Sequence, residues 1–301
     1  MRIPMRETLV ALANLTRIHF AVFWPLIFCS GLVLAFANYG GFSWALIARA
    51  ALIGLLGFLA GLVLNDYVDR EYDLRDVDDS LTRYWRPFGA RPIPEGTIPP
   101  GVAPGLFLVF AGSAAAAAAT LPVPHNLYVI GIMGYSFLAE YFYQTKKRCQ
   151  TRPIAQVVGR TEFALFPVAG YLVYGNPDTT ALLIFLFFYP WALAHLAVND
   201  MIDIANDRAR GMATIPVLYG MRGAAVWTFG FTALHAGIAL TFGLALSWIA
   251  LTGFGMGLAF LAVACHLIIR GLKPAAAMQA LPLIHASLLI YAVAIIAATA
   301  P

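Results

Sequence analysis

Long apolar runs separated by polar connections make up most of this chain. Windows of about 20 apolar residues, the length that crosses a bilayer as a helix, lie at 18–38, 43–65, 101–121, 124–143, 154–174, 179–199, 223–243, 245–269 and 279–299. The runs are continuous rather than alternating, which favours helices over a membrane barrel. The pattern therefore predicts an all-α integral membrane protein, a bundle of nine transmembrane helices.

Composition and charge give this bundle an orientation. Hydrophobic residues make up 61% of the chain and charged residues 11%, which leaves too little polar surface for a soluble globule. Of the 19 Lys and Arg residues, all except Arg49 and Arg160 fall on one side of the nine windows. By the positive-inside rule that side, which includes the N-terminus, is cytoplasmic. We expect a multi-pass protein without a removable signal peptide, in the cell membrane if the source is prokaryotic, with the lipid bilayer and no nucleic acid as partner.

One acidic motif occurs twice with identical spacing. Asn-Asp-x-x-Asp-x-x-x-Asp stands at 65–73 and again at 199–207, each time at the cytoplasmic end of an apolar run. On a helix the first, fifth and ninth residues of the motif drift by only about 40° per step, so they line one face. Mg²⁺ prefers a few carboxylates with water and phosphate as its other ligands. The two motifs therefore predict a Mg²⁺ site that binds a diphosphate at the cytoplasmic ends of the second and sixth helices.

The connections that carry the motifs are the longest polar segments. We expect one membrane domain over 1–301, with cytoplasmic cap loops at 66–100 and 203–222. The first has too much Pro and Gly to stay helical up to residue 100, although a short helix fits near 74–84, and its length is more typical of a lid than of a linker. Because the motifs follow windows four apart, the pattern suggests four-helix pseudo-repeats over about 10–150 and 151–270, plus a ninth helix at 279–299.

The motifs resemble those of the UbiA family of membrane prenyltransferases. The first motif has Arg70 after its middle acid, and a following R-P-I-P-x-G-x-I stands at 91–98. The second motif is followed by Gly211 and by T-I-P-V-x-x-G at 214–220. The chain departs from the family pattern between Asp73 and Arg91, where 17 residues with an extra Arg-Pro pair form a longer connection than expected.

This resemblance implies a reaction. A family member transfers an isoprenoid chain from an allylic polyprenyl diphosphate, geranyl to geranylgeranyl or longer, to a small aromatic or lipid acceptor. The acceptor types include glyceryl-ether lipids and quinone precursors, and the second motif looks closer to the glyceryl-ether, chlorin and homogentisate branches. Mg²⁺ is the implied cofactor, because it neutralises the leaving diphosphate while a carbocation-like carbon forms in an apolar, water-excluding chamber.

Roles follow for individual residues. The expected metal ligands are Asn65, Asp69, Asp73, Asp203 and Asp207. The expected catalytic residues are Asp66, Asp200 and Lys146. The expected diphosphate-binding residues are Arg17, Arg70, Tyr143, Lys146 and Arg208. His195, Asn199 and Arg91 are expected at the acceptor or in the pocket wall.

Plainer interpretations stay open for some of these residues. Any one of the basic residues can instead be an interfacial anchor whose charged end reaches water. Asp66 and Asp200 are each rotated by about 100° from the first residue of their motif, so a structural or proton-accepting role competes with metal ligation. Arg160 and Glu162 stand two apart in one window, so we expect their partners on other helices.

Two other classes of membrane protein compete with this interpretation. A transporter with duplicated halves would place its acidic residues near the middle of the membrane, whereas these lie at helix ends beside basic connections. A different Mg²⁺-dependent membrane transferase, of the CDP-alcohol phosphotransferase type, would carry one contiguous motif with Gly where this chain has Arg70.

Overall fold

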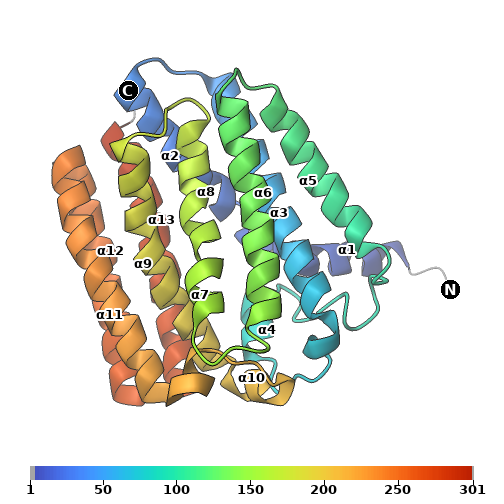
Figure 1. Ribbon diagram of the computed structural model, residues 1–301. Helices are drawn as coiled ribbons and strands as arrows, with labels where there is room; N and C mark the ends of the chain where they lie inside the picture. The colour runs from blue at the N-terminus through green and yellow to red at the C-terminus, as the bar shows by residue number, and fades with distance from the viewer. Residues whose placement is uncertain (1–3, 300–301) are drawn as a thin grey trace.

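The computed structural model describes residues 4–299, and the basic Arg2 counted above lies outside them. The chain is all-α within this range (Figure 1). Its α-helices are α1 (Met5–Leu15), α2 (Phe23–Tyr39), α3 (Trp44–Asp73), α4 (Ser80–Trp85), α5 (Ala103–Ala119), α6 (His125–Lys146), α7 (Ile154–Gly159), α8 (Thr161–Leu172), α9 (Thr179–Ile202), α10 (Ile204–Arg210), α11 (Ile215–Leu246), α12 (Trp248–Gly271) and α13 (Pro274–Thr299), and a 3₁₀ turn, η1 (Ile18–Phe20), precedes α2.

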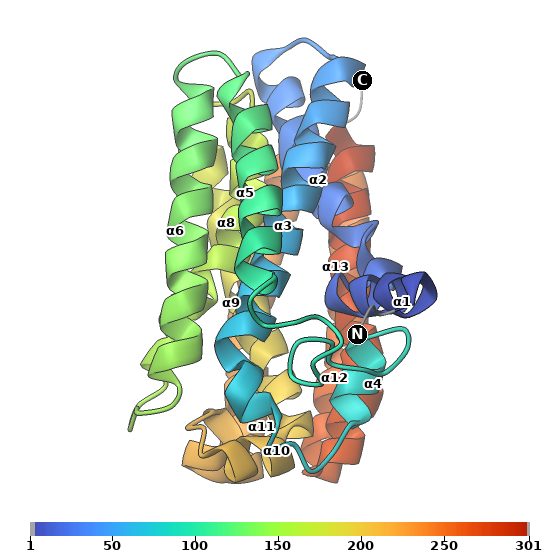
Figure 2. The same ribbon diagram turned by 90° about the vertical axis from the view of Figure 1, so that its right-hand side faces the viewer.

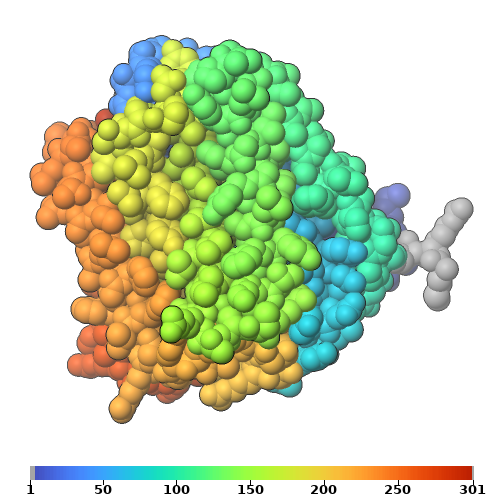
Figure 3. Space-filling view, in the orientation of Figure 1, coloured from blue at the N-terminus to red at the C-terminus, as the bar shows by residue number. Residues whose placement is uncertain are grey.

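The long helices run side by side as one bundle, and the short ones gather toward one end of it. Figures 1 and 2 show α4 and α10 at the lower end of the bundle, while α1 lies across its flank. The space-filling view shows the α6–α7 region as a continuous surface, with the α10 segment along its lower edge (Figure 3). Both acidic motifs are at this lower end, because α3 and α9 run toward it.

The predicted all-α membrane bundle is confirmed, and the chain is a multi-pass integral membrane protein. Each of the nine predicted windows overlaps a helix. Six helical segments in the described range are long and apolar enough to cross a membrane: Ile18–Tyr39, α3, α9, α11, α12 and α13. The apolar α5 is shorter.

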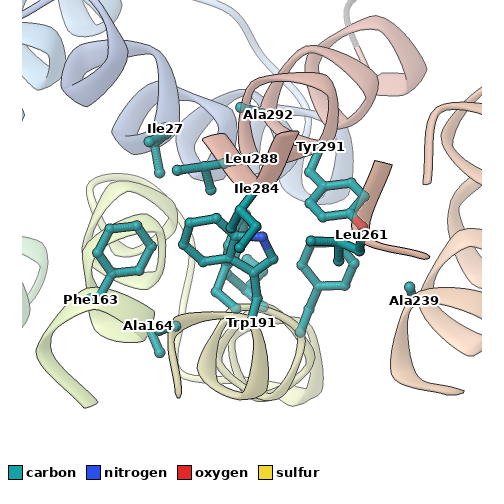
Figure 4. Packing of buried hydrophobic residues seen from close by; sticks show 14 of the residues in the cluster. Ile27, Phe163, Ala164, Trp191, Ala239, Leu261, Ile284, Leu288, Tyr291 and Ala292 are labelled. Carbon is teal, nitrogen blue, oxygen red and sulfur yellow. The ribbon is translucent and has the colours of Figure 1, made fainter. Parts of the chain in front are cut away.

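The core of the bundle surrounds α9. Figure 4 shows Trp191 of α9 among residues of α8 and α13, including Phe163 and Leu288. Small residues allow the closest contact, between α2 and α8. A Cβ on Gly31 would lie 2.0 Å from the Pro167 carbonyl oxygen, and a Cβ on Gly170 would lie 1.8 Å from the Phe28 carbonyl oxygen. Such close backbone approach is how membrane helices gain packing energy when lipid supplies no hydrophobic driving force.

The window at 154–174 is two helices rather than one. The helix is interrupted at Arg160, between α7 and α8, where the Thr161 hydroxyl donates to the Val158 carbonyl at 2.6 Å. Because of this break the Arg160 guanidinium reaches Glu162 at 3.5 Å. The expectation that their partners lie on other helices assumed a continuous helix, so it missed this contact. Arg160 also has a partner on another helix, because its guanidinium lies 5.1 Å from the ring centroid of Tyr143 in α6.

The second motif also spans a break. α9 ends at Ile202 and α10 begins at Ile204, so Asp203 lies at the junction, and the predicted single helix through 199–207 was wrong. Most of the 203–222 segment, expected as a loop, is helical: α10 is followed at Ile215 by α11, which bends at Gly220 (φ 71°). In the first cap, α4 corresponds to the short helix expected near 74–84. The windows gave no sign of α1.

Candidate active site

Both acidic motifs line a single cavity of about 300 Å³. From the first motif Asn65, Asp69 and Asp73 face it, all on one side of α3 as their spacing predicts. The second motif contributes Asn199, Asp200, Asp203 and Asp207. Segments more than one hundred residues apart in the chain are thus brought to one site.

Part of the wall of the same cavity, away from the motifs, is formed by apolar side chains. Phe28, Phe58, Met133 and Phe166 line this part. Phe58 stacks on Trp24 with ring centroids 3.6 Å apart, which fixes its orientation. The cavity therefore joins a charged end to an apolar chamber between α2, α3, α6 and α8.

The middle acid of the first motif pairs with the end of α6. Lys147 Nζ donates to Asp69 Oδ2 at 2.6 Å, and Arg148 Nη2 donates to Asp69 Oδ1 at 2.9 Å. One turn earlier, Asn65 Nδ2 donates to Glu140 Oε1 at 2.7 Å. Glu140 is buried inside α6, where an unpaired carboxylate would be costly. These contacts fix α6 against the motif face of α3.

The last acid of the first motif is bound by two arginines from distant segments. Asp73 lies 2.6 Å from Arg91 Nη1 and 3.2 Å from Arg210 Nη2. Arg210 also reaches Asp203 at 3.4 Å, so it connects the two motifs. Burial alone would lower the pKa of Arg210, but the carboxylates of Asp73, Asp203 and Asp76 outweigh it and raise the pKa. Burial and Asp73 act on Arg91 in the same opposing way, and its pKa is also raised.

Asp66, an expected catalytic residue, is sealed beneath the cavity rather than facing it. It is 1% exposed and absent from the cavity wall described here. Arg86 Nη2 donates to both of its carboxylate oxygens at 2.9 and 2.8 Å, and Arg17 Nη2 lies 3.2 Å from Oδ1. The structure therefore places Asp66 as the anchor of two guanidiniums, both of which line the cavity.

The second motif is less neutralised. Asp207 accepts one side-chain hydrogen bond, from the Thr214 hydroxyl at 2.7 Å. Burial, together with the charges of Asp200 and Asp203, raises the pKa of Asp207 well above its ordinary value. Burial also raises the pKa of Asp203. Asp200 Oδ2 is buried with no hydrogen-bond partner among residues 4–299. These are carboxylates that a cation would stabilise.

The oxygen atoms of the two motifs are of the kind that binds Mg²⁺, although their side chains do not form one compact cluster. Seven side chains of the two motifs face the cavity with carboxylate or amide oxygens, and such oxygens are the ligands that Mg²⁺ prefers. The unpartnered Asp200 oxygen and the raised pKa of Asp207 both mark a deficit of positive charge. Within the described residues no three acidic, His or Cys side chains form a metal-sized cluster, because Arg and Lys partners hold several of the carboxylates.

The expected diphosphate-binding residues divide into two groups. Arg17 and Tyr143 line the cavity, as does Arg91, which was expected at the acceptor or in the pocket wall. Lys146, Arg70 and Arg208 do not belong to the cavity wall in the described part of the chain. Arg70 donates to the Tyr67 carbonyl at 2.7 Å, and Arg208 is exposed on α10.

Sequence reasoning missed four residues that line the charged end: Arg86, Glu140, Lys147 and Arg210. Lys147 follows Lys146, and the two cannot be told apart from sequence, because the end of α6 decides which side chain points inward. Glu140 had a usable signal, because a carboxylate inside an apolar window is expensive and so needs a partner. Arg86 had one as well, in the extra Arg-Pro pair.

His195 and Asn199 lie in the cavity wall, where they had been expected. His195 is buried and stacks on Trp191, with centroids 5.0 Å apart and planes inclined by 9°. Asn199 donates to His195 Nε2 at 3.0 Å and accepts a hydrogen bond from Trp85 Nε1 at 3.2 Å. This side of the cavity is formed by α9 and α4.

Comparison with known proteins agrees with this arrangement. Residues 22–298 match the model of the UbiA prenyltransferase family. The chain is 30% identical over 176 residues to a digeranylgeranylglyceryl phosphate synthase of Methanothermobacter thermautotrophicus, covering 57% of this chain and 55% of that protein. It is 28% identical over 220 residues to a 4-hydroxybenzoate octaprenyltransferase of Albidiferax ferrireducens, covering 73% and 70%. With a protoheme IX farnesyltransferase of Bacillus pumilus it shares 28% over 206 residues, covering 66% and 64%.

Solved structures share the fold. A UbiA homologue from Aeropyrum pernix superposes with a TM-score of 0.71 at 17% identity, covering 93% of this chain and 96% of that one. A UbiA homologue from Archaeoglobus fulgidus, bound to DMAPP and Mg²⁺, superposes with a TM-score of 0.68 at 18% identity, covering 95% and 99%. These likenesses show the fold, and the family match over residues 22–298 shows that the chain belongs to the UbiA prenyltransferase family.

Proposed function

We propose that this protein is a Mg²⁺-dependent prenyltransferase that moves an isoprenoid chain from an allylic polyprenyl diphosphate to a membrane-associated acceptor. One observation carries the proposal: two acidic motifs, from distant parts of the chain, line a charged cavity that continues into an apolar chamber. A diphosphate fits the charged end and an isoprenoid tail fits the apolar part. The donor range is geranyl to geranylgeranyl or longer, and the acceptor is a glyceryl-ether lipid, a quinone precursor or a related compound.

The residues divide into metal-binding and phosphate-binding sets. Asn65, Asp69 and Asp73 would hold metal from α3, and Asp203 and Asp207 would hold it from α9 and α10. When bound, Mg²⁺ supplies positive charge to the departing diphosphate oxygens. Asp200 adds a further carboxylate beside the second set, suited to ligation or to accepting a proton.

Cations already paired with these carboxylates are placed to bind the phosphate oxygens. Lys147, Arg91 and Arg210 lie within 2.6–3.4 Å of the motif acids and line the cavity. With Mg²⁺ held by the carboxylates, these cations would donate to the diphosphate and stabilise the charge that develops as the carbon–oxygen bond breaks. Lys147 takes the role that the sequence suggested for Lys146.

The apolar chamber protects the reacting carbon. Phe58 and Phe166 line it with Met133, and none of these side chains carries an O–H or N–H group that would hold water beside the reacting carbon. They exclude water from the allylic carbocation until the acceptor attacks it. The same wall holds the isoprenoid tail between helices that face lipid.

We also propose the topology that the basic residues suggest. Nine membrane spans correspond to α2, α3, α5, α6, α7 with α8, α9, α11, α12 and α13. α4 and α10 lie at the same end of the bundle as the motifs, and the basic connections lie there as well (Figure 2). By the positive-inside rule this end faces the cytoplasm.

The test is product formation by the purified protein in lipid. Geranylgeranyl diphosphate is supplied with and without Mg²⁺, and an acceptor panel that includes geranylgeranylglyceryl phosphate and 4-hydroxybenzoate is analysed by mass. We expect a Mg²⁺-dependent prenylated product, which Asp203→Asn abolishes and Arg208→Gln, an exposed residue of the same helix, leaves intact. Diphosphate release that is independent of Mg²⁺, or unaffected by Asp203→Asn, would overturn the proposal.

A further inference from the structure

A chain of hydrogen bonds connects α4 to the cavity through two buried histidines. Tyr84 Oη lies 2.7 Å from His285 Nδ1, and His285 Nε2 lies 2.9 Å from His195 Nε2. Both histidines are 8% exposed, and His195 lines the cavity. The metal site and the phosphate-binding residues proposed above do not account for these hydrogen bonds.

The direction of each hydrogen bond follows from its donors. An indole N–H only donates, so Trp85 Nε1 fixes Asn199 with its carbonyl oxygen toward Trp85 and its NH₂ group toward His195. The NH₂ group lies 3.0 Å from His195 Nε2 and 3.2 Å from the His195 carbonyl oxygen. A proton on Nε2 would face the amide hydrogens at this distance, so Nε2 accepts and carries no proton in the neutral ring.

The proton positions of His285 and Tyr84 follow from that of His195. Because His195 Nε2 is an acceptor, His285 must donate to it from Nε2, which leaves His285 Nδ1 as an acceptor. Tyr84 then donates to that nitrogen. Burial raises the pKa of Tyr84 to about 12, so its hydroxyl keeps the proton that this bond requires. If Tyr84 accepted instead, the two facing Nε2 atoms would have no proton between them.

One consequence concerns the cavity. A neutral His195 with an unprotonated Nε2 must carry its proton on Nδ1. That atom has no hydrogen-bond partner among residues 4–299, and it is not one of the unpartnered polar atoms sealed from solvent. His195 thus presents an N–H donor on a residue of the cavity wall.

The wall beside this donor carries excess positive charge. Arg17 and Arg86 share a single carboxylate, Asp66, and both line the cavity. Trp85 is close to both groups: its ring is 5.8 Å from the Arg17 guanidinium carbon and 6.2 Å from the His195 ring. A donor N–H and a surplus guanidinium, both beside one indole, form a subsite for an anionic oxygen.

We propose that His195 binds an anionic oxygen of the prenyl acceptor, a carboxylate or phosphate oxygen, through Nδ1–H, and that Tyr84, His285 and Asn199 are positioning residues that hold this tautomer. The inference rests on the proposed prenyl transfer and narrows its acceptor class. It also gives the long connection between Asp73 and Arg91 a role, because α4 supplies both Tyr84 and Trp85.

The first experiment reads the tautomer without any turnover. Protein labelled with ¹⁵N-histidine is placed in lipid nanodiscs, and the His195 signals are identified by their loss in His195→Asn. We expect the Nδ1–H form in the wild type, and a shift toward the Nε2–H form in Tyr84→Phe, which keeps the ring but removes the donor. An Nε2–H form in the wild type would overturn the proposal.

The second experiment tests the ligand with matched probes. 4-Hydroxybenzoate and glycerol 1-phosphate carry the two anionic groups, and phenol and glycerol lack them. We expect the His195 Nδ1–H resonance to move with at least one anionic probe and with neither neutral one. If neither anionic probe moves it, or if phenol moves it equally, the proposal fails, whether or not the protein transfers prenyl groups.

Kinetics separate this subsite from the metal site. In whichever acceptor reaction is active, we expect His195→Leu to lower kcat/KM for the acceptor by about 10- to 100-fold, the worth of a hydrogen bond to a charged group. Binding of geranylgeranyl diphosphate with Mg²⁺ should be unchanged. His195→Asn, whose amide NH₂ occupies nearly the position of Nδ1, should recover most of the loss, and His235→Asn, in a buried histidine outside the cavity wall, is the matched control. Equal loss in the Asn and Leu variants would show that His195 only fills space.

Discussion

Removal of the Asp66 charge tests whether this acid of the first motif has a structural role or binds metal. In Asp66→Asn the guanidiniums of Arg86 and Arg17 lose their shared counter-charge, while side-chain volume and shape are preserved. Arg86 is 3% exposed, so water cannot replace the carboxylate on its inner side. Breaking a buried ion pair by removing one partner costs about 3–5 kcal/mol.

The lower end of that range applies here. Arg17 is 15% exposed at its side chain, and both guanidiniums face the cavity, so part of the lost interaction is recovered through solvent. A loss of about 3 kcal/mol corresponds to a fall in Tm of roughly 5 °C for a chain of 301 residues, because the unfolding entropy is about 2.1 cal/mol/K per residue. The assay is thermal unfolding in one fixed detergent, followed by tryptophan fluorescence.

A second substitution makes the cause testable. Arg86→Met removes one of the two stranded charges and keeps much of the side-chain volume, so the double variant with Asp66→Asn should recover at least half of the lost Tm. Asp203→Asn is the contrasting variant, and we expect it to abolish turnover with a smaller change in Tm. If Asp66→Asn unfolds like the wild type but raises the Mg²⁺ concentration for half-maximal activity by tenfold or more, Asp66 is a metal ligand and the structural assignment is refuted.

Three further outcomes are expected. Lys147→Met should lower kcat/KM for the prenyl diphosphate by about 10²–10³-fold, because it removes a preorganised hydrogen bond to the charge that develops on the leaving group. Lys146→Met, outside the cavity wall, should change kcat/KM by no more than about twofold. Equal losses for the two variants in steady-state assays would contradict the assignment of Lys147. Burial raises the pKa of Asp203, and burial with neighbouring carboxylates raises the pKa of Asp207. The metal-free protein should therefore lose stability as pH rises from about 4, the pKa of Asp in the unfolded chain, toward these raised pKa values. Mg²⁺ should reverse this loss of stability, bind more tightly as pH rises and release protons in calorimetry. Gly170→Ala should destabilise by about 1–3 kcal/mol, since its Cβ would meet the Phe28 carbonyl, while Gly237→Ala, with open space around it, should not; equal Tm values for the two variants would refute the close packing of α2 and α8.

The fold was predictable because apolar length and helical period carry most of the information in a membrane bundle. The windows located the long helices, and the motif spacing located the acidic face of α3, where one continuous helix kept the 0, +4, +8 register. The same argument was wrong at 199–207, because hydropathy does not reveal that α9 stops before Asp203. It was also wrong at Arg160, whose break lets residues two apart meet.

The charged partners were harder to predict than the acids. A repeated acidic motif can be found in one sequence, but its Arg and Lys partners come from segments with no shared spacing. Arg210 reaches Asp73 across 137 positions, and Lys147 reaches Asp69 across 78. Pairing of this kind depends on which helix ends meet at the cavity. The contact between Tyr84 and His285 has the same character, with 201 positions between the partners.

The charge balance of the cavity suggests why metal and diphosphate would bind together. Among residues 4–299, its wall carries seven acidic and six basic side chains. The acidic ones are Asp69, Asp73, Glu140, Glu162, Asp200, Asp203 and Asp207, and the basic ones are Arg17, Arg86, Arg91, Lys147, Arg160 and Arg210. Near-neutrality means that a diphosphate alone would meet carboxylates with no free countercharge, and a cation alone would leave guanidiniums displaced from their partners. If Mg²⁺ and diphosphate bound together, the carboxylates would hold the metal, and the Arg and Lys side chains released from them would bind the phosphate oxygens. The internal ion pairs thus stabilise the charged wall, and they would keep both sets of ligands close to a bound diphosphate.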